Sequence, residues 1–122
     1  MASTRNIFAA LLYSLCSLIA LQAPVAVAAT YYVDSNGSDS NSGLSGSPWQ
    51  TLQKAANTLQ PGDEVLVENG SYAGFHTARD GTSTTPIVFK ANGNSVVIYQ
   101  QNSSTSDVIN IEGHDYVVID GF

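Results

Sequence analysis

Short apolar strand motifs that recur at a constant interval constrain the fold of this chain more than any other feature. Val65-Leu66-Val67, Ile87-Val88-Phe89 and Ile109-Asn110-Ile111 begin at evenly spaced positions, 65, 87 and 109, and a turn containing glycine follows each one. A second series, Val96-Val97-Ile98 and Val117-Val118-Ile119, begins at positions 96 and 117 and has almost the same spacing. Short strands separated by turns at a fixed period are typical of a β-solenoid, in which each repeat forms one coil. The sequence therefore predicts an all-β parallel solenoid with a continuous apolar core.

One other architecture shares some of these features. A small β-sandwich with a single helix also uses short strands and glycine-rich turns, but the regular interval favours the solenoid. In a solenoid that ends at Phe122, no following coil would cover Val117 and Ile119. We therefore expect self-association through the last coil.

An amphipathic helix is predicted just before the repeats. Its apolar stripe falls at positions i, i+3, i+4 and i+7, which are Leu52, Ala55, Ala56 and Leu59. Ser47 is the predicted N-cap, Pro48 suits the first helical position, and Gln50 completes a capping box. Pro61-Gly62 ends the helix. A helix this short needs a surface to lie on, so we predict that it caps the first coil.

The chain begins with the pattern of an export signal. Arg5 precedes an apolar stretch over residues 7–21, and Ala26-Val27-Ala28 fits a cleavage site. We predict a signal peptide at residues 1–28, a strand, loop and capping helix at 29–63, and the first coils of a truncated β-helix at 64–122. The predicted location is secreted or periplasmic, with no membrane attachment after cleavage.

Charge excludes some partners of the processed chain. It keeps three cations, Lys54, Arg79 and Lys90, against all ten acidic residues, a net charge of −7, and it loses Cys16. This balance argues against binding to nucleic acid or to an anionic membrane. It does not exclude an acidic polysaccharide, because a bound cation or a local basic patch reverses the sign.

Five segments, in order along the chain, resemble the start of pectate-lyase-like right-handed parallel β-helix proteins. They run from Tyr31 to Asp39, from Pro48 to Ala55, from Pro61 to Val67, from Pro86 to Ala91 and from Tyr116 to Phe122. The resemblance implies binding of an extended polysaccharide and, in the lyases, β-elimination by a Lys or Arg base next to a neutralised uronate. It places that chemistry on central coils, so we assign no catalytic residue and expect the active site beyond Phe122.

This resemblance leaves three interpretations, which are two functions and a chain without activity. The first is the N-terminal portion of an exported lyase that cleaves pectate-type, uronic-acid-containing polysaccharide. The second is a non-catalytic β-helix, such as a carbohydrate-binding, adhesin-like or surface protein. The third is a truncated gene product without activity. No cofactor is assigned to this segment, and Ca²⁺ is expected only in a longer protein.

The sequence offers a cation-binding loop and two histidines as candidate sites. The Ser-, Asn- and Asp-rich run at residues 34–41 is rich in oxygen ligands, but it lacks the spacing of an EF-hand and its residue types favour turns anyway. His76 and His114 have no metal-ligand partner at a recognisable spacing. We interpret all of these residues as parts of solvated loops, and metal binding stays open.

Charged and aromatic residues supply the remaining candidates. Lys90 and Arg79 are predicted to point outward, where charged side chains keep a strand soluble. Glu112, Asp115 and Asp120 are interpreted as solvated corners rather than paired catalytic carboxylates. Trp49 is predicted to anchor the cap on the first coil. The other aromatic residues considered for sugar stacking are Tyr31, Tyr32, Tyr72, Phe75 and Tyr99.

Overall fold

The computed structural model describes residues 27–122, so nearly all of the predicted signal peptide lies outside the described residues. One helix and eight strands are present in this part of the chain, and they are β1 (Thr30–Val33), α2 (Leu52–Thr58), β2 (Glu64–Val67), β3 (Gly70–Ala73), β4 (Phe75–His76), β5 (Ile87–Ala91), β6 (Val96–Gln100), β7 (Ile109–Asn110) and β8 (Val117–Asp120). No helix among residues 27–122 has the length and apolar composition needed to cross a membrane.

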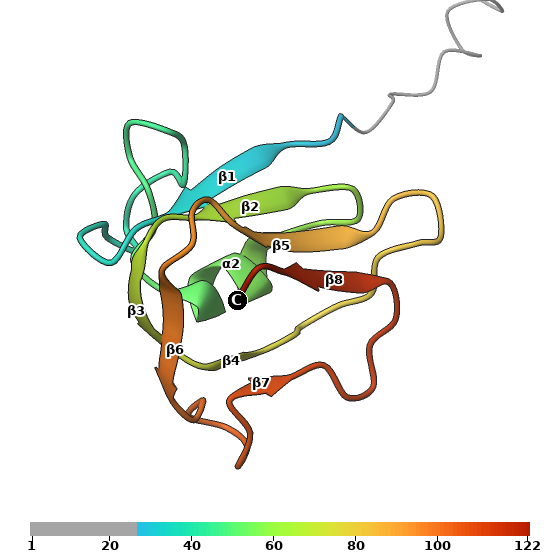
Figure 1. Ribbon diagram of the computed structural model, residues 1–122. Helices are drawn as coiled ribbons and strands as arrows, with labels where there is room; N and C mark the ends of the chain where they lie inside the picture. The colour runs from blue at the N-terminus through green and yellow to red at the C-terminus, as the bar shows by residue number, and fades with distance from the viewer. Residues whose placement is uncertain (1–26) are drawn as a thin grey trace, which may run out of the picture.

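The strands form three parallel sheets around one core. The sheet orders are β1-β2-β5-β8, β3-β6 and β4-β7, and every pairing between these strands is parallel. Figure 1 shows the strands arranged in a ring, with successive coils stacked along the line of view. The chain therefore visits each sheet once per coil, and the prediction of a parallel β-helix is confirmed.

The predicted repeat register is wrong, although the fold is right. Ile109 does not stack on Ile87, because Ile109 pairs with Phe75 of β4 and Val117 pairs with Ile87. The residues stacked in one inward row are Val65, Phe89 and Ile119, so the spacing is uneven and the second interval is longer than the first. The coils differ in length mainly because their corners differ. Gly74 alone connects β3 to β4, whereas residues 101–108 connect β6 to β7.

Inward side chains build the core from alternate strand positions, as a pleated strand requires. Val65, Val67 and Phe89 are at most 1% exposed, while Leu66, between the two valines, and Lys90, directly after Phe89, point outward. Phe75 of β4 stacks on Phe89 of β5 across the coil, with ring centroids 4.6 Å apart. Burial of these large side chains supplies the main stabilisation of a chain whose described part contains no cysteine.

The helix begins later than the capping box predicted. Thr51 is the N-cap and its hydroxyl accepts from the backbone of Lys54, so Ser47, Pro48 and Gln50 lie outside α2. Trp49 explains the difference. Its backbone N–H donates to Tyr32 O and its carbonyl accepts from Asp34 N, which keeps this segment extended alongside β1.

The predicted lid is confirmed. The stripe Leu52, Ala55, Ala56 and Leu59 is at most 4% exposed and belongs to the core cluster. In Figure 1, α2 lies across the far end of the ring of strands, behind β8. The helix therefore buries its own apolar face and the first coil in one contact.

Gln53 closes the outer edge of β4 from the solvent-facing side of this helix. Its side-chain amide donates to His76 O and accepts from His76 N, both at 3.1 Å. A primary amide carries the same donor and acceptor pair as a peptide group, so one side chain takes the place of a neighbouring strand.

Candidate functional site

A hollow on the flank of the solenoid lies between the N-terminal loop and β3. Its volume is about 300 Å³, and its lining residues are Ser35, Gln50, Thr51, Ser71, Tyr72, Ala73 and Tyr99. The outward side chains of β3 are small, Ser71 and Ala73, whereas the next coil presents Val97 and Tyr99. Ser71 and Ala73 therefore form the floor of the hollow, between the N-terminal loop on one side and the larger side chains of the next coil on the other.

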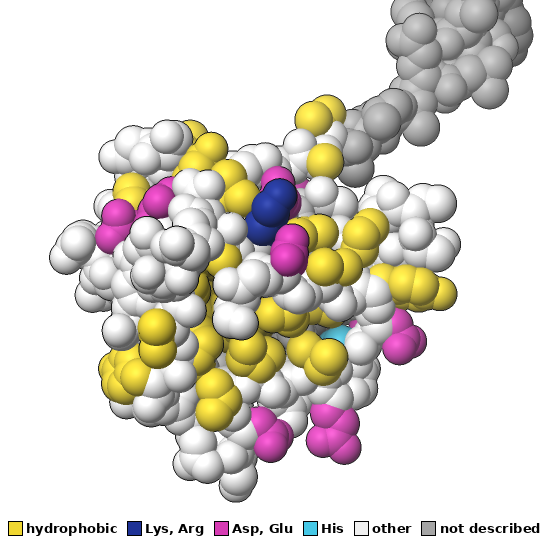
Figure 2. All heavy atoms as spheres, viewed as in Figure 1, with side chains coloured by type: hydrophobic (Ala, Val, Ile, Leu, Met, Phe, Trp, Pro, Cys, Tyr) yellow, Lys and Arg dark blue, Asp and Glu magenta, His cyan; other side chains and the backbone are white. Residues whose placement is uncertain are grey.

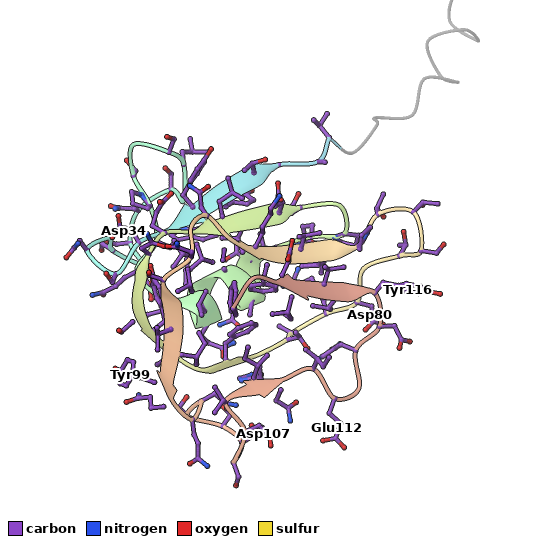
Figure 3. All side chains as sticks on the ribbon, viewed as in Figure 1. Asp34, Asp80, Tyr99, Asp107, Glu112 and Tyr116 are labelled. Atoms are coloured by element: carbon purple, nitrogen blue, oxygen red, sulfur yellow. The ribbon has the colours of Figure 1, made fainter. Side chains whose placement is uncertain are left out.

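A β-bulge directs Tyr99 onto this flank. The register between β3 and β6 shifts between Tyr72, which pairs with Ile98, and Ala73, which pairs with Gln100, so Tyr99 has no partner in β3. The Tyr99 side chain is 61% exposed, and Figure 3 shows it projecting away from β6 on the outside of the ring. Bulges of this kind re-aim a side chain and recur beside functional sites.

Tyr72 fixes the geometry of the hollow from inside. Its hydroxyl donates to Glu68 O at 2.7 Å and accepts from Ser35 N at 3.2 Å, which ties the loop to β3. Burial is the largest cause that raises the pKa of the Tyr72 phenol, and the charges of Asp34 and Glu68 raise it further. Tyr72 is therefore a neutral structural group at neutral pH.

Asp39 fixes the opposite wall. One of its carboxylate oxygens accepts from Gln50 N and Thr51 N, and the other accepts from the Thr51 hydroxyl at 2.7 Å. Asp34 accepts from Asn36 N in a local turn. Both carboxylates of the candidate cation loop thus accept hydrogen bonds from the protein, Asp34 within its own turn and Asp39 from Gln50 and Thr51. Among residues 27–122, no three His, Cys, Asp or Glu side chains form a group fit to hold a metal ion.

The two histidines occupy different positions. His76 is part of β4 rather than of a loop, which corrects the prediction, and its Nδ1 is buried without a hydrogen-bond partner among the described residues. His114 lies at a turn, and its Nδ1 is 2.9 Å from Asp80 on the neighbouring coil. The pKa of Asp80 is lowered, first by the Asp115 N–H that donates to the same oxygen and then by His114. This pair links two successive corners.

The charged candidate residues also lie in different environments. Lys90 is exposed on the outward face of β5, as predicted. Arg79 instead donates through Nη2 to Asn57 O of α2 at 2.8 Å, so the interpretation of Arg79 as an outward solubilising charge is wrong. Glu112, Asp115 and Asp120 are exposed, but Asp120 is the last residue of β8 rather than part of a turn.

The aromatic candidates differ in how far they are exposed. Trp49 is 2% exposed, its indole N–H donates to Asn41 O at 2.9 Å, and its ring stacks on Tyr31, which confirms its anchoring role. A Cβ on Gly43 would overlap the Trp49 ring, so glycine is required there. Tyr72 and Phe75 are buried, and among the six aromatic candidates only Tyr99 is exposed.

Sequence reasoning considered Tyr99 but not the floor of the hollow. Ser71 and Ala73 lie on β3, a strand that the repeat pattern did not predict. Gln50 was assigned to a capping box, yet its side chain is exposed at the rim. The available signal was the alternation of Ser71 and Ala73 with buried Tyr72, which is short and weak.

Comparison with known proteins agrees with the architecture. No family model matches the chain. A curated pectate lyase, PEL9 of Emericella nidulans, is 32% identical over 79 residues, which cover 62% of this chain and 19% of that protein. The chain thus spans about a fifth of the length of this relative.

Two solved structures extend the similarity. A rhamnogalacturonan lyase gives a TM-score of 0.59 at 26% identity, covering 76% of this chain and 27% of that chain. The complex of XylC with xylose gives a TM-score of 0.53 at 33% identity, covering 55% of this chain and 11% of that one. The described residues therefore have the pectate lyase-like parallel β-helix architecture, which lyases and glycoside hydrolases share.

Proposed function

We propose that this chain forms the cap and opening coils of an exported β-helix protein that acts on polysaccharide. The observation that carries the proposal is the joint sequence and fold similarity to a rhamnogalacturonan lyase over 76% of the chain. The physical basis is the stacked sheet. Strands in register about 4.8 Å apart create a long, regular outer face, against which an extended polymer can lie across several coils.

The specific reaction that we propose is β-elimination in a uronic-acid-containing polysaccharide of the pectate type. This reaction needs a base and a positive charge that neutralises the uronate. Lys90 is exposed on the outer face of β5, while Arg79 is bonded to α2. We place the reacting groups on coils beyond Phe122, with Ca²⁺ as the expected cation there.

The proposal is tested by separating binding from cleavage. The chain is run in native gels containing pectate, rhamnogalacturonan or neutral xylan, with and without Ca²⁺. We expect retarded migration in at least one polysaccharide and no ultraviolet absorbance from unsaturated uronate after incubation. Migration unchanged by every polysaccharide contradicts the carbohydrate role, and a Ca²⁺-dependent rise in absorbance contradicts the location beyond Phe122.

Export is a separate part of the proposal. Residues 1–28 carry the expected leader, and Edman sequencing of protein recovered from the periplasm or medium should begin at Ala29 or Thr30. Recovery of only the uncleaved chain from the cytoplasm would contradict export.

A second candidate function is a non-catalytic carbohydrate-binding β-helix. The hollow beside β3 favours it, because neutral polar side chains and one exposed ring line a concave surface. Binding without cleavage by the protein isolated from its natural source would support this function over the lyase.

A further inference from the structure

We propose that the hollow between the N-terminal loop and β3 is a subsite for one neutral sugar ring stacked on Tyr99. The inference rests on the proposed carbohydrate-related function and specifies a ligand class and a location for it. The location is the flank formed by β3 and β6, at the capped end of the solenoid.

The shape of the hollow fits a single ring. Its volume of about 300 Å³ is at the small end of the range for ligand pockets. Ser71 and Ala73 form a low floor, the loop residues Gln50 and Thr51 form one side, and Tyr99 stands on the other. The apolar face of a pyranose, made of C–H groups, can pack on the exposed phenol ring while the hydroxyls turn toward the floor.

Polar groups with spare hydrogen-bonding capacity surround this floor. The Gln50 amide and the Ser71 hydroxyl are on exposed residues and make no hydrogen bond with other described residues, whereas the Thr51 hydroxyl is already bonded to Asp39. Together these two groups offer both donors and acceptors, as sugar hydroxyls require.

The backbone of β3 adds further groups. Gly70 and Gly74 donate their N–H groups to Ser95 O and Gln100 O on the β6 side. Alternate residues of a strand direct their peptide groups to opposite edges, so those of Ser71 and Ala73 face the other edge, beside the hollow. No strand pairs with β3 along that edge within the described residues.

Charge selects a neutral ligand. None of the seven lining residues is charged, and the carboxylate of Asp39 accepts from the backbone N–H groups of Gln50 and Thr51 at one side of the hollow. A uronate would meet this carboxylate with no cation among the lining residues to compensate it. A neutral hexose or pentose residue meets only dipoles, so we expect it to be preferred over galacturonate.

The test compares two exposed tyrosines. Tyr99 is 61% exposed in the hollow and Tyr116 is 56% exposed at another corner, so Tyr116→Ala is the matched control for Tyr99→Ala. Saturation-transfer NMR is recorded with xylohexaose as the neutral probe and trigalacturonate as the acidic one. We expect the xylohexaose signal to be retained in Tyr116→Ala. Tyr99→Ala should raise the Kd for xylohexaose by on the order of tenfold.

A second variant tests the floor without removing the ring. Ala73→Leu fills the hollow from an outward position, and it should reduce xylohexaose binding while circular dichroism shows the same melting transition. Tyr99→Phe keeps the stacking face and should keep binding.

Three results would overturn the inference. They are no xylohexaose signal in the unaltered chain, equal binding by Tyr99→Ala and Tyr116→Ala, and tighter binding of trigalacturonate than of xylohexaose. If xylohexaose fails while pectate still retards the chain in gels, the subsite is wrong and the broader carbohydrate role stands.

Discussion

The two ends of this solenoid are built differently. At the N-terminal end, α2 covers the first coil, and its stripe residues Leu52 and Leu59 are at most 1% exposed. At the other end, Val117 and Ile119 of β8 are only partly buried, although they occupy the same inward rows as Ile87 and Phe89. Figure 2 views this second end, and hydrophobic side chains are visible across the middle of the face. A coil cannot bury its own core residues, so burial depends on what is stacked next to it.

The strand edges differ in the same way. Gly43 and Trp49 form backbone hydrogen bonds along the outer edge of β1, and Gln53 bonds to the edge of β4. In contrast, β8 has a neighbouring strand on one side only within residues 27–122. At the N-terminal end, a loop and a side chain thus form hydrogen bonds with the backbone groups of the strand edges. An unprotected edge leaves such groups to solvent or to another chain.

The largest effect is expected from removing a core residue of the capped end. Leu52→Ala should lower the free energy of unfolding by about 2–5 kcal/mol, because it removes buried methyl groups and leaves a cavity. Leu44→Ala, at a side chain that is 57% exposed, is the matched control and should change it by about 0.5 kcal/mol or less. Urea unfolding followed by circular dichroism measures both, and equal effects would contradict the role of α2 as a lid.

A smaller effect is expected at the edge that Gln53 covers. Gln53→Ala should cost about 1–3 kcal/mol, because His76 N and His76 O lose their partner. Gln60→Ala serves as the control, since the Gln60 amide makes only a local exposed contact with Thr58 O. Faster hydrogen exchange at the His76 amide in Gln53→Ala alone would support the strand-like role, and equal exchange would exclude it.

The end of the solenoid at β8 is expected to form contacts between molecules. Concentration-dependent self-association through β8 remains a prediction, and Val118→Lys should weaken it because charge on an edge strand opposes pairing. Sedimentation velocity should show a lower association state for this variant than for Val97→Lys on β6. A monodisperse monomer at all concentrations would contradict the prediction.

The smallest effect is expected at the corner pair. The folded state lowers the pKa of Asp80 below its ordinary value of 3.8, so the stabilisation is present above that value and is lost as pH falls through the lowered pKa. Asp80→Asn should therefore lower Tm slightly at a pH of about 5, and the difference from the unaltered chain should shrink toward a pH of about 2. A difference that grows on acidification would contradict this assignment.

Local patterns in the sequence predicted the elements well. The strand motifs became β2, β5, β6, β7 and β8, and the apolar stripe of α2 is buried as expected. Their alternation of apolar and polar residues is a property of neighbouring positions, so it can be read directly. Strand β3 was missed because it contains Gly70 and Ser71 and little apolar sequence, and β4 was missed because it is only two residues long.

The candidate site was less accessible to sequence reasoning. Tyr99 was one aromatic residue among six, and nothing local distinguishes it from buried Tyr72. The bulge that exposes it arises from pairing with a strand of the preceding coil, since Tyr72 pairs with Ile98. The partners of Arg79 and Gln53 are similarly distant in sequence.

The sequence by itself determined that this chain folds as a capped parallel β-helix, because strand period, turn residues and an amphipathic helix are encoded within short stretches of chain. Only the tertiary structure decided which strands stack. Corner lengths make the second coil longer than the first, and the connection over residues 101–108 places Ile109 beside Phe75, so that Val117 becomes the neighbour of Ile87. The hollow beside β3 follows from that stacking, because it exists only where small side chains of one coil lie beneath large ones of the next.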